Sequence, residues 1–88
     1  MDVIPWNRLK SVPQESVEVG MAIVTPVAFQ TYREAKDGSV TGIGWAPCTG
    51  RVWIVTEIGP DTVRARNESS GEEITGEIRP GQRMLIRI

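Results

Sequence analysis

The longest run of β-favouring residues in the chain lies between residues 50 and 59. Alternate residues of a strand point to opposite faces, and here both faces are apolar. One face carries Val52, Ile54 and Ile58, and the other carries Trp53 and Val55. A strand of this kind must be covered on both sides, as when one bent strand serves two small sheets. We therefore predict that residues 50–59 form the central strand of an all-β domain.

The segment from residue 17 to residue 25 is the first convincing strand, and Pro26 ends it. Its apolar positions alternate, which places Val17, Val19, Met21 and Ile23 on one side. Gly20 lies on the other side, where it indicates either a bulge or a close approach of the backbone.

Residues 27–47 allow two interpretations. The first is a short helix that is closed by Gly38. The second is a hairpin with a two-residue turn at Asp37-Gly38, because both residues tolerate positive φ. We favour the hairpin, since the glycine-rich segment 40–45 is poor helix material. In its register Ala35 faces Val40, Tyr32 faces Ile43 and Gln30 faces Trp45, so that Tyr32, Ile43 and Trp45 share one face.

The C-terminal third alternates regularly between apolar and polar residues. It predicts strands at residues 62–67, 72–78 and 83–88, with a turn at 68–71 and a tight connector at 79–82. The turn pairs Ala65 with Ile74 on the inside and Arg66 with Glu73 on the outside. The residues expected to point inward are Val63, Ala65, Ile74, Ile78, Met84, Ile86 and Ile88.

Residues 1–16 show no strong period, and two prolines interrupt them. We predict an N-terminal arm over residues 1–16, followed by the β domain over residues 17–88. Trp6, Leu9 and Val12 recur at i, i+3 and i+6 along the arm. The interpretation that we favour is that they cover an open end of the core, and the alternative is a partner-binding arm.

The succession of elements from residue 17 to residue 88 resembles the Src-homology-3-type (SH3-like) small barrel, including its Tudor-like and KOW-like relatives. The shared features are one strand, a long irregular hairpin, a long central strand, two strands joined by a tight turn, a proline connector and a last strand. The resemblance implies a five- to six-stranded barrel with a long first hairpin, but a shared fold does not imply a shared function. The peptide-binding members carry an Ala-Leu-Tyr-Asp-Tyr segment and paired tryptophans. This chain lacks both, so polyproline recognition is not implied.

Composition narrows the class of protein. The chain has 88 residues, of which 40% are hydrophobic and 24% charged, and a formal net charge of -1, which fits one compact globular domain. A charge so close to zero gives no bulk attraction to nucleic acid or to a membrane. No apolar run approaches the roughly twenty residues of a membrane span. A single cysteine and the lack of a recognisable signal peptide lead us to expect a cytoplasmic protein.

The sequence contains few of the residues on which enzymes usually rely for catalysis. Histidine is absent, which removes the commonest general base and metal ligand. Cys48 would act as a nucleophile only beside a base that lowers its pKa, so we interpret it as a small passive residue. Glu73 and Glu77 alternate with arginines of the neighbouring strand, which indicates charge pairing rather than a cation site. We therefore predict a protein that is not an enzyme and uses no cofactor or metal.

Two candidate surfaces follow from the remaining residues. The first would bind a protein partner through Trp6, Tyr32, Ile43, Trp45 and Trp53, because large aromatic side chains contribute a disproportionate share of interface energy. For Trp53, packing in the core is the interpretation that we favour. The second would contact phosphates or nucleic acid through arginines at outward strand positions, namely Arg64, Arg66, Arg83 and Arg87.

The aromatic surface is the stronger of the two, because interleaved glutamates cancel much of the arginines' field. We predict a non-enzymatic protein-interaction module, of the kind found among small regulatory or inhibitory accessory proteins of phages and mobile elements. The alternative is a nucleic-acid or nucleotide-binding small barrel. A second copy of the chain is a further candidate partner, either through the edge of the last strand or through the N-terminal arm.

Overall fold

The computed structural model describes residues 1–27, 31–44 and 46–88. The described residues confirm the all-β class, with nine strands and two short 3-10 helices. In chain order these elements are β1 (Asp2–Ile4), η1 (Trp6–Arg8), β2 (Leu9–Pro13), η2 (Gln14–Ser16), β3 (Ala22–Pro26), β4 (Tyr32–Glu34), β5 (Val40–Gly42), β6 (Cys48–Ile58), β7 (Thr62–Asn67), β8 (Glu73–Glu77) and β9 (Arg83–Arg87). Among these residues there is no helix whose length and apolar character would let it cross a membrane.

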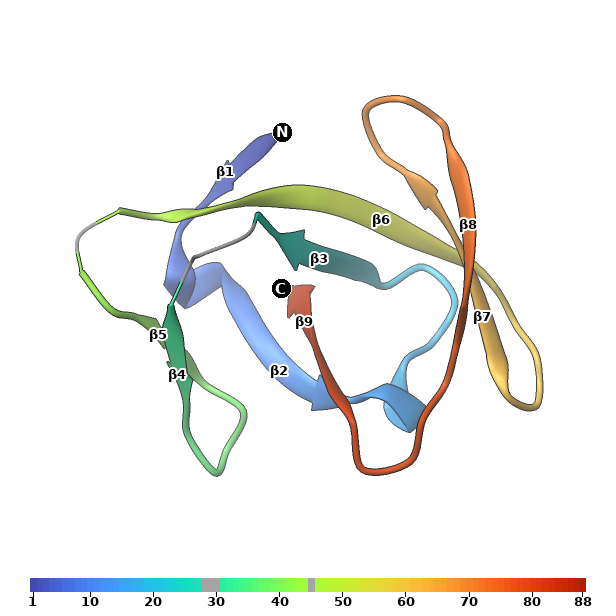
Figure 1. Cartoon of the computed structure of the whole chain (residues 1–88), viewed down its shortest axis with the longest axis horizontal. Helices are drawn as coiled ribbons and strands as arrows, with labels where there is room; N and C mark the ends of the chain where they lie inside the picture. Colours follow the sequence, from blue (N-terminus) through green and yellow to red (C-terminus); the bar gives the residue numbers. More distant parts are fainter. Residues whose placement is uncertain (28–30, 45) are drawn as a thin grey trace.

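Most strands belong to one antiparallel sheet with the order β2-β9-β3-β6-β7-β8. Strand β6 crosses the molecule, with β3 along one edge and with β1 and β7 along the other (Figure 1). Strands β4 and β5 form a separate hairpin. The prediction of a closed barrel with five or six strands is wrong. The described strands number nine, and their order ends at β2 and β8, which do not pair with each other.

The N-terminal segment adds strands to the sheet instead of forming the predicted arm. Strand β1 pairs with β6, and β2 pairs with the whole of β9. Leu9 is buried in one core cluster and Trp6 packs against that cluster, whereas Val12 packs against the second cluster. The three residues therefore do not form the predicted cover over one open end of the core. Strand β2 was not predicted because its second buried position is Ser11, and a serine interrupts the apolar alternation by which strands are recognised.

Strand β6 is apolar and covered on both faces, as predicted. Val52 packs in one core cluster and Val55 in a second cluster on the opposite face, and these side chains are only 2% and 1% exposed. A β-bulge between Val55 and Glu57 shifts the register against β7. It places Ile58 opposite Val63, on the face of Val55 and not on the face of Val52 that strict alternation predicts.

The first predicted strand is shorter than expected, since β3 begins only at Ala22. Gly20 has a φ of 94°, a left-handed conformation that turns the chain before the strand. Its N–H donates to Val55 O at 2.9 Å, but nothing lies within 4 Å of the position that a Cβ would take, so the left-handed turn and not a close approach of the backbone accounts for the glycine. Because of this turn Val19 is 63% exposed, and its predicted inward orientation is wrong.

Strands β7 and β8 pair as the turn between them predicts, with Ala65 opposite Ile74 and Arg66 opposite Glu73. The expected burial of the outermost apolar residues is wrong, however. Ile74 is 41% exposed and Ile88 is 62% exposed. Strand β8 lies beyond the core at the end of the sheet, and Ile88 follows the last residue of β9.

Strands β4 and β5 form the predicted hairpin in a register that differs by one residue. Tyr32 pairs with Gly42 and not with Ile43. The turn holds three residues instead of two, and it closes through a hydrogen bond from Ala35 N–H to Ser39 O at 2.9 Å. A shift of one residue moves every side chain of one strand to the other face. Tyr32 and Ile43 therefore lie on opposite faces, and the predicted shared face is wrong.

Candidate functional site

Trp6 and Tyr32 pack against each other at one end of the molecule. Their ring centroids lie 5.6 Å apart, with an angle of 33° between the ring planes. The indole Nε1–H of Trp6 donates to Ala46 O at 2.9 Å. A Cβ at Gly42 would lie 2.1 Å from Trp6 Nε1, so the glycine allows the indole to lie directly against β5. The pKa of the Tyr32 hydroxyl is raised, first by burial and second by the negative charge of the neighbouring Glu34 carboxylate.

The other predicted aromatic and aliphatic contacts do not join this pair. Ile43 is 54% exposed on the opposite face of the hairpin. Trp45, like its predicted partner Gln30, lies outside the described residues. Trp53 is 6% exposed, and its Nε1–H donates to Thr25 Oγ1 at 3.1 Å, which makes it a core residue and not an exposed anchor.

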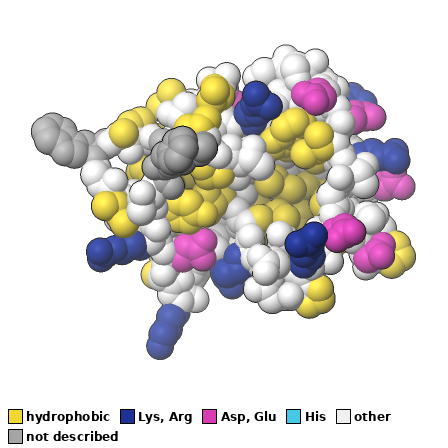
Figure 2. All heavy atoms as spheres, in the orientation of Figure 1, with side chains coloured by type: hydrophobic (Ala, Val, Ile, Leu, Met, Phe, Trp, Pro, Cys, Tyr) yellow, Lys and Arg dark blue, Asp and Glu magenta, His cyan; other side chains and the backbone are white. Residues whose placement is uncertain are grey.

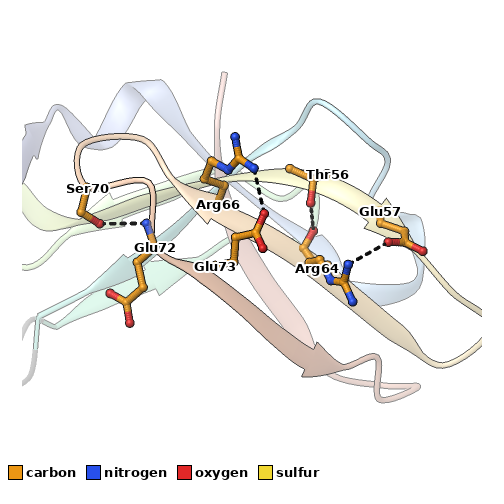
Figure 3. Close-up of polar contacts among 7 residues, drawn as sticks. All are labelled: Thr56, Glu57, Arg64, Arg66, Ser70, Glu72 and Glu73. Atoms are coloured by element: carbon orange, nitrogen blue, oxygen red, sulfur yellow. Dashed lines mark hydrogen bonds and ion pairs between the residues drawn. The ribbon is translucent and has the colours of Figure 1, made fainter.

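Each arginine of the predicted phosphate surface lies beside a carboxylate. On β7, Arg66 Nη2 is 2.8 Å from Glu73 Oε1, and Arg64 Nη1 is 3.3 Å from Glu57 Oε2 (Figure 3). The hydrogen bond from Arg66, together with its charge, holds the pKa of Glu73 below its usual range. Basic and acidic side chains accordingly alternate along the edge where β7 and β8 lie (Figure 2). A phosphate group would have to displace these carboxylates, so the surface is not an open anion site.

Arg83 has a structural role. Its Nε–H donates to Ser11 Oγ and its Nη2–H to Ser11 O, both at 2.9 Å, and Ser11 is only 1% exposed. The N–H of Ser11 donates to Gly38 O at 2.8 Å, which ties β2 to the turn of the hairpin. Arg83 also lies 3.7 Å from the Glu34 carboxylate on β4. These contacts hold the hairpin against the main sheet. They also occupy the Arg83 guanidinium, which is therefore not free to bind a phosphate.

Two clefts flank η1 and meet at Ile88. The β1 cleft has a volume of about 450 Å³ and is lined by Asp2, Val3, Ile4, Pro5, Arg8, Glu68, Arg87 and Ile88. The hairpin cleft has a volume of about 380 Å³ and is lined by Trp6, Asn7, Leu9, Lys10, Asp37, Ser39, Val40 and Ile88. Residues of η1 contribute to both clefts, so the two form one surface along the N-terminal residues.

Two exposed aliphatic side chains stand in these clefts. Val3 is 66% exposed and Ile88 is 62% exposed. The backbone fixes Ile88, because its N–H donates to Arg8 O at 2.8 Å. At the rim of the β1 cleft, Arg87 Nη2 lies 2.8 Å from Glu68 Oε2. Of the predicted site residues, Trp6 lines the hairpin cleft and Arg87 lines the β1 cleft. Sequence reasoning missed Val3 and Ile88, since the alternation of β9 predicts Ile88 as an inward residue and gives no sign that the sheet ends before it.

Charge is distributed unevenly over the molecule. Within the described ranges, the basic side chains without an ion pair are Arg8, Lys10, Arg33, Lys36 and Arg51. All but the last belong to η1, β2 and the hairpin, where the only nearby acidic residues of the same elements are Glu34 and Asp37. Residues 56–79 carry the opposite excess, with six acidic residues and three arginines. The hairpin end is therefore basic, and the β7–β8 end is acidic.

Neither catalytic groups nor similarity to known proteins identifies the function. Cys48 is 0% exposed, and burial raises the pKa of its thiol, which is the opposite of activation. In the part of the chain that the structure describes, no group of three or more acidic residues or cysteines could hold a metal ion. Comparisons of the chain with protein-family models, with curated proteins and with solved structures found no match.

Proposed function

We propose that the chain is a non-enzymatic protein-interaction module that binds its partner through the β1 cleft and the hairpin cleft. The observation that carries this proposal is the position of Ile88, which is 62% exposed where the two clefts meet. Val3 extends the apolar surface into one cleft, and Trp6 extends it into the other. Full burial of an aliphatic side chain of this size contributes about 1.5–3 kcal/mol. A partner that covers Ile88 and Val3 would gain most of its affinity there.

The surroundings of these side chains support a protein partner. Asp2, Arg8, Lys10 and Asp37 line the clefts, together with the ion pair of Glu68 and Arg87. Protein interfaces combine an apolar centre with a polar rim in this way. Because the rim carries both signs of charge, we expect the affinity to depend only weakly on salt. A module of this kind acts by occupying the surface of a larger protein, which is a regulatory or inhibitory role.

We also propose that strands β9, β3, β6, β7 and β8 form an opened SH3-like arrangement. The support is their order in the sheet, together with the long hairpin that connects β3 to β6. Strands β1 and β2 and helix η1 are additions to that arrangement by the N-terminal residues (Figure 1). Both clefts follow these additions, so the partner surface lies on the part of the chain that departs from the SH3-like order.

A nucleic-acid partner is the second candidate, and one observation favours it. Arg8, Lys10, Arg33 and Lys36 have no ion pair among the described residues, and they gather at the hairpin end. Contacts between basic side chains and phosphates weaken steeply as the salt concentration rises. Salt dependence therefore distinguishes this candidate from an apolar protein interface.

The test is capture of partners from an extract of the source cells by the wild-type chain, by three variants in which an exposed apolar residue becomes glutamate, and by the charge-reversal variant Arg33→Glu. Ile88→Glu and Val3→Glu should each reduce the captured protein at least about tenfold, because a carboxylate would be buried without a partner. The matched control is Val19→Glu, since Val19 is 63% exposed but lies outside both clefts. Equal capture by all three variants would contradict the proposal. Capture that disappears with nuclease, with high salt or in Arg33→Glu would favour nucleic acid instead.

A further inference from the structure

The outer edge of β8 is a second surface, separate from the clefts. Every residue of Glu73–Glu77 is exposed, and no other strand in the described ranges is exposed at all of its residues. Strand β8 pairs with β7 on one side and ends the sheet on the other. Figure 1 shows it at the outside of the molecule. Its unpaired backbone is therefore accessible to another strand.

Hydrogen bonds at both ends of the β7–β8 ladder identify the outward backbone groups. Asn67 N–H donates to Glu72 O at 2.7 Å, and Ile78 N–H donates to Asp61 O at 2.8 Å. In an antiparallel ladder, hydrogen-bonded pairs alternate with pairs that are not hydrogen-bonded. With the observed register, the even-numbered residues of β8 bond to β7. The N–H and C=O groups that point away from β7 are consequently those of Glu73, Thr75 and Glu77.

The charges of this edge specify the chemistry of an added strand. Segment 72–77 contains three glutamates and no basic residue. Glu73 and Glu77 lie on the same face of the sheet, and Glu73 is opposite Arg66 of β7. Opposite charges across neighbouring strands are stabilising, whereas like charges are destabilising. Basic residues opposite Glu73 and Glu77 would therefore continue the alternation of charge that β7 and β8 begin.

The other face of β8 is apolar and incomplete. Ile74 is 41% exposed, and nothing lies within 4 Å of the position that a Cβ on Gly76 would take. Their partners in β7, Ala65 and Val63, are buried. Apolar side chains opposite Ile74 and Gly76 would extend this face by one strand, and a large aromatic side chain has room to cover the glycine.

We propose that β8 is a β-augmentation site for an extended segment of another protein, which adds antiparallel to this edge. The segment carries basic residues at positions i and i+4 and apolar residues at i+1 and i+3. A second copy of β8 does not fit, because antiparallel pairing centred on Thr75 would place Glu73 of one copy opposite Glu77 of the other. None of these residues lines either cleft, so the proposal stands or fails independently of the function proposed above.

The probe is a capped peptide, Ser-Lys-Phe-Thr-Val-Lys-Ser, titrated into the isotope-labelled chain and followed by NMR. Its central threonine would lie opposite Thr75, with phenylalanine opposite Gly76. We expect the largest shift changes on β8, and slower hydrogen exchange of the Glu73, Thr75 and Glu77 amides once they become hydrogen-bonded. Replacing both lysines by glutamate, or N-methylating the central threonine, should weaken binding at least about fivefold in each case.

Two variants of the chain complete the test. Thr75→Pro removes an N–H that points to the free edge without removing a hydrogen bond to β7, and it should weaken peptide binding at least about tenfold. Should that variant not fold, the double variant Glu73→Gln, Glu77→Gln should weaken the lysine peptide about threefold to tenfold and leave the glutamate peptide no weaker.

Several results would overturn the proposal. These are shift changes confined to the clefts, unslowed exchange of the three amides at peptide saturation, or wild-type binding by folded Thr75→Pro. A dimer in sedimentation that Thr75→Pro dissociates would also overturn it, since the occupant of the edge would then be a second copy.

Discussion

Arg83 holds Ser11 at two points, with Nε–H donating to Oγ and Nη2–H donating to the backbone oxygen, each at 2.9 Å. Ser11 is almost completely buried, and a buried hydroxyl is tolerated where its hydrogen bonds are satisfied. Through the bond from Ser11 N–H to Gly38 O, the same contact reaches the turn of the hairpin. One guanidinium thus connects β9, β2 and the hairpin that forms one wall of the hairpin cleft.

Arg83→Ala should lower the free energy of unfolding by about 2 kcal/mol, because it removes two charge-assisted hydrogen bonds, of which one partner is buried. Urea denaturation measures the change. The matched control is Arg64→Ala, whose ion pair with Glu57 is exposed and should contribute less than about 1 kcal/mol. If the two variants lost the same stability, Arg83 would be an ordinary surface arginine.

The sequence was sufficient to predict those parts of the fold that depend on local patterns. The register of β7 and β8 follows from alternation plus a turn of fixed length, and the pairing of Arg66 with Glu73 agrees with it. The predicted register of the hairpin is wrong because the length of its turn was wrong. The residues Asp37-Gly38 fit a two-residue and a three-residue turn equally well. One additional turn residue was enough to separate Tyr32 from Ile43.

Gly42→Ala should destabilise the chain by about 1–3 kcal/mol, the usual cost of an additional methyl group in a filled space. The new Cβ would lie 2.5 Å from two further atoms of the Trp6 ring, so the indole must move away from β5. We expect the Nε1–H of Trp6 to lose its bond to Ala46 O, which NMR detects as a shift of the indole proton. The matched control is Gly76→Ala, because no atom lies near its Cβ position. An unchanged indole signal in Gly42→Ala would contradict the packing described for Trp6.

The candidate site was less predictable than the fold, and the reason is physical. The sequence predicts that Arg66 lies on one strand and that Arg83 and Arg87 lie on another, but it does not show which carboxylates are close enough to neutralise them. Ile88 reads as a core residue, because only the three-dimensional structure shows that the sheet stops before it. The clefts likewise depend on β1 and η1. The sequence does not predict these elements, because prolines interrupt the N-terminal residues and no periodic pattern can be recognised there.

The carboxyl group of Asp37 should titrate below its ordinary value of 3.8, since the hydroxyl and the N–H of Ser39 both donate to Oδ1. A lowered pKa in the folded state means that this group stabilises the fold above pH 3.8 and that its contribution is lost as the pH falls through the folded pKa. Ser39→Ala removes the largest cause and should raise the pKa toward its ordinary value in an NMR titration. Lys10→Gln should raise it less, because the charge of Lys10 is the smallest of the causes. The reverse order of the two variants would contradict this assignment.

The hydrogen bond from Trp53 Nε1–H to Thr25 Oγ1 allows a final test of whether Trp53 belongs to the core. Thr25→Val keeps the shape and the β-branched character of the side chain but leaves the indole N–H without its acceptor. Because the ring is 6% exposed, water cannot fully replace that acceptor, and we expect a loss of about 1–2 kcal/mol in urea denaturation. Thr25→Ser retains the oxygen and should restore most of the stability. Thr41→Val is the matched control, since Thr41 is exposed on a strand and its variant should lie within about 0.5 kcal/mol of the wild type. If Thr25→Val were as stable as Thr41→Val, the indole would have access to water, and Trp53 would again be a candidate for partner binding.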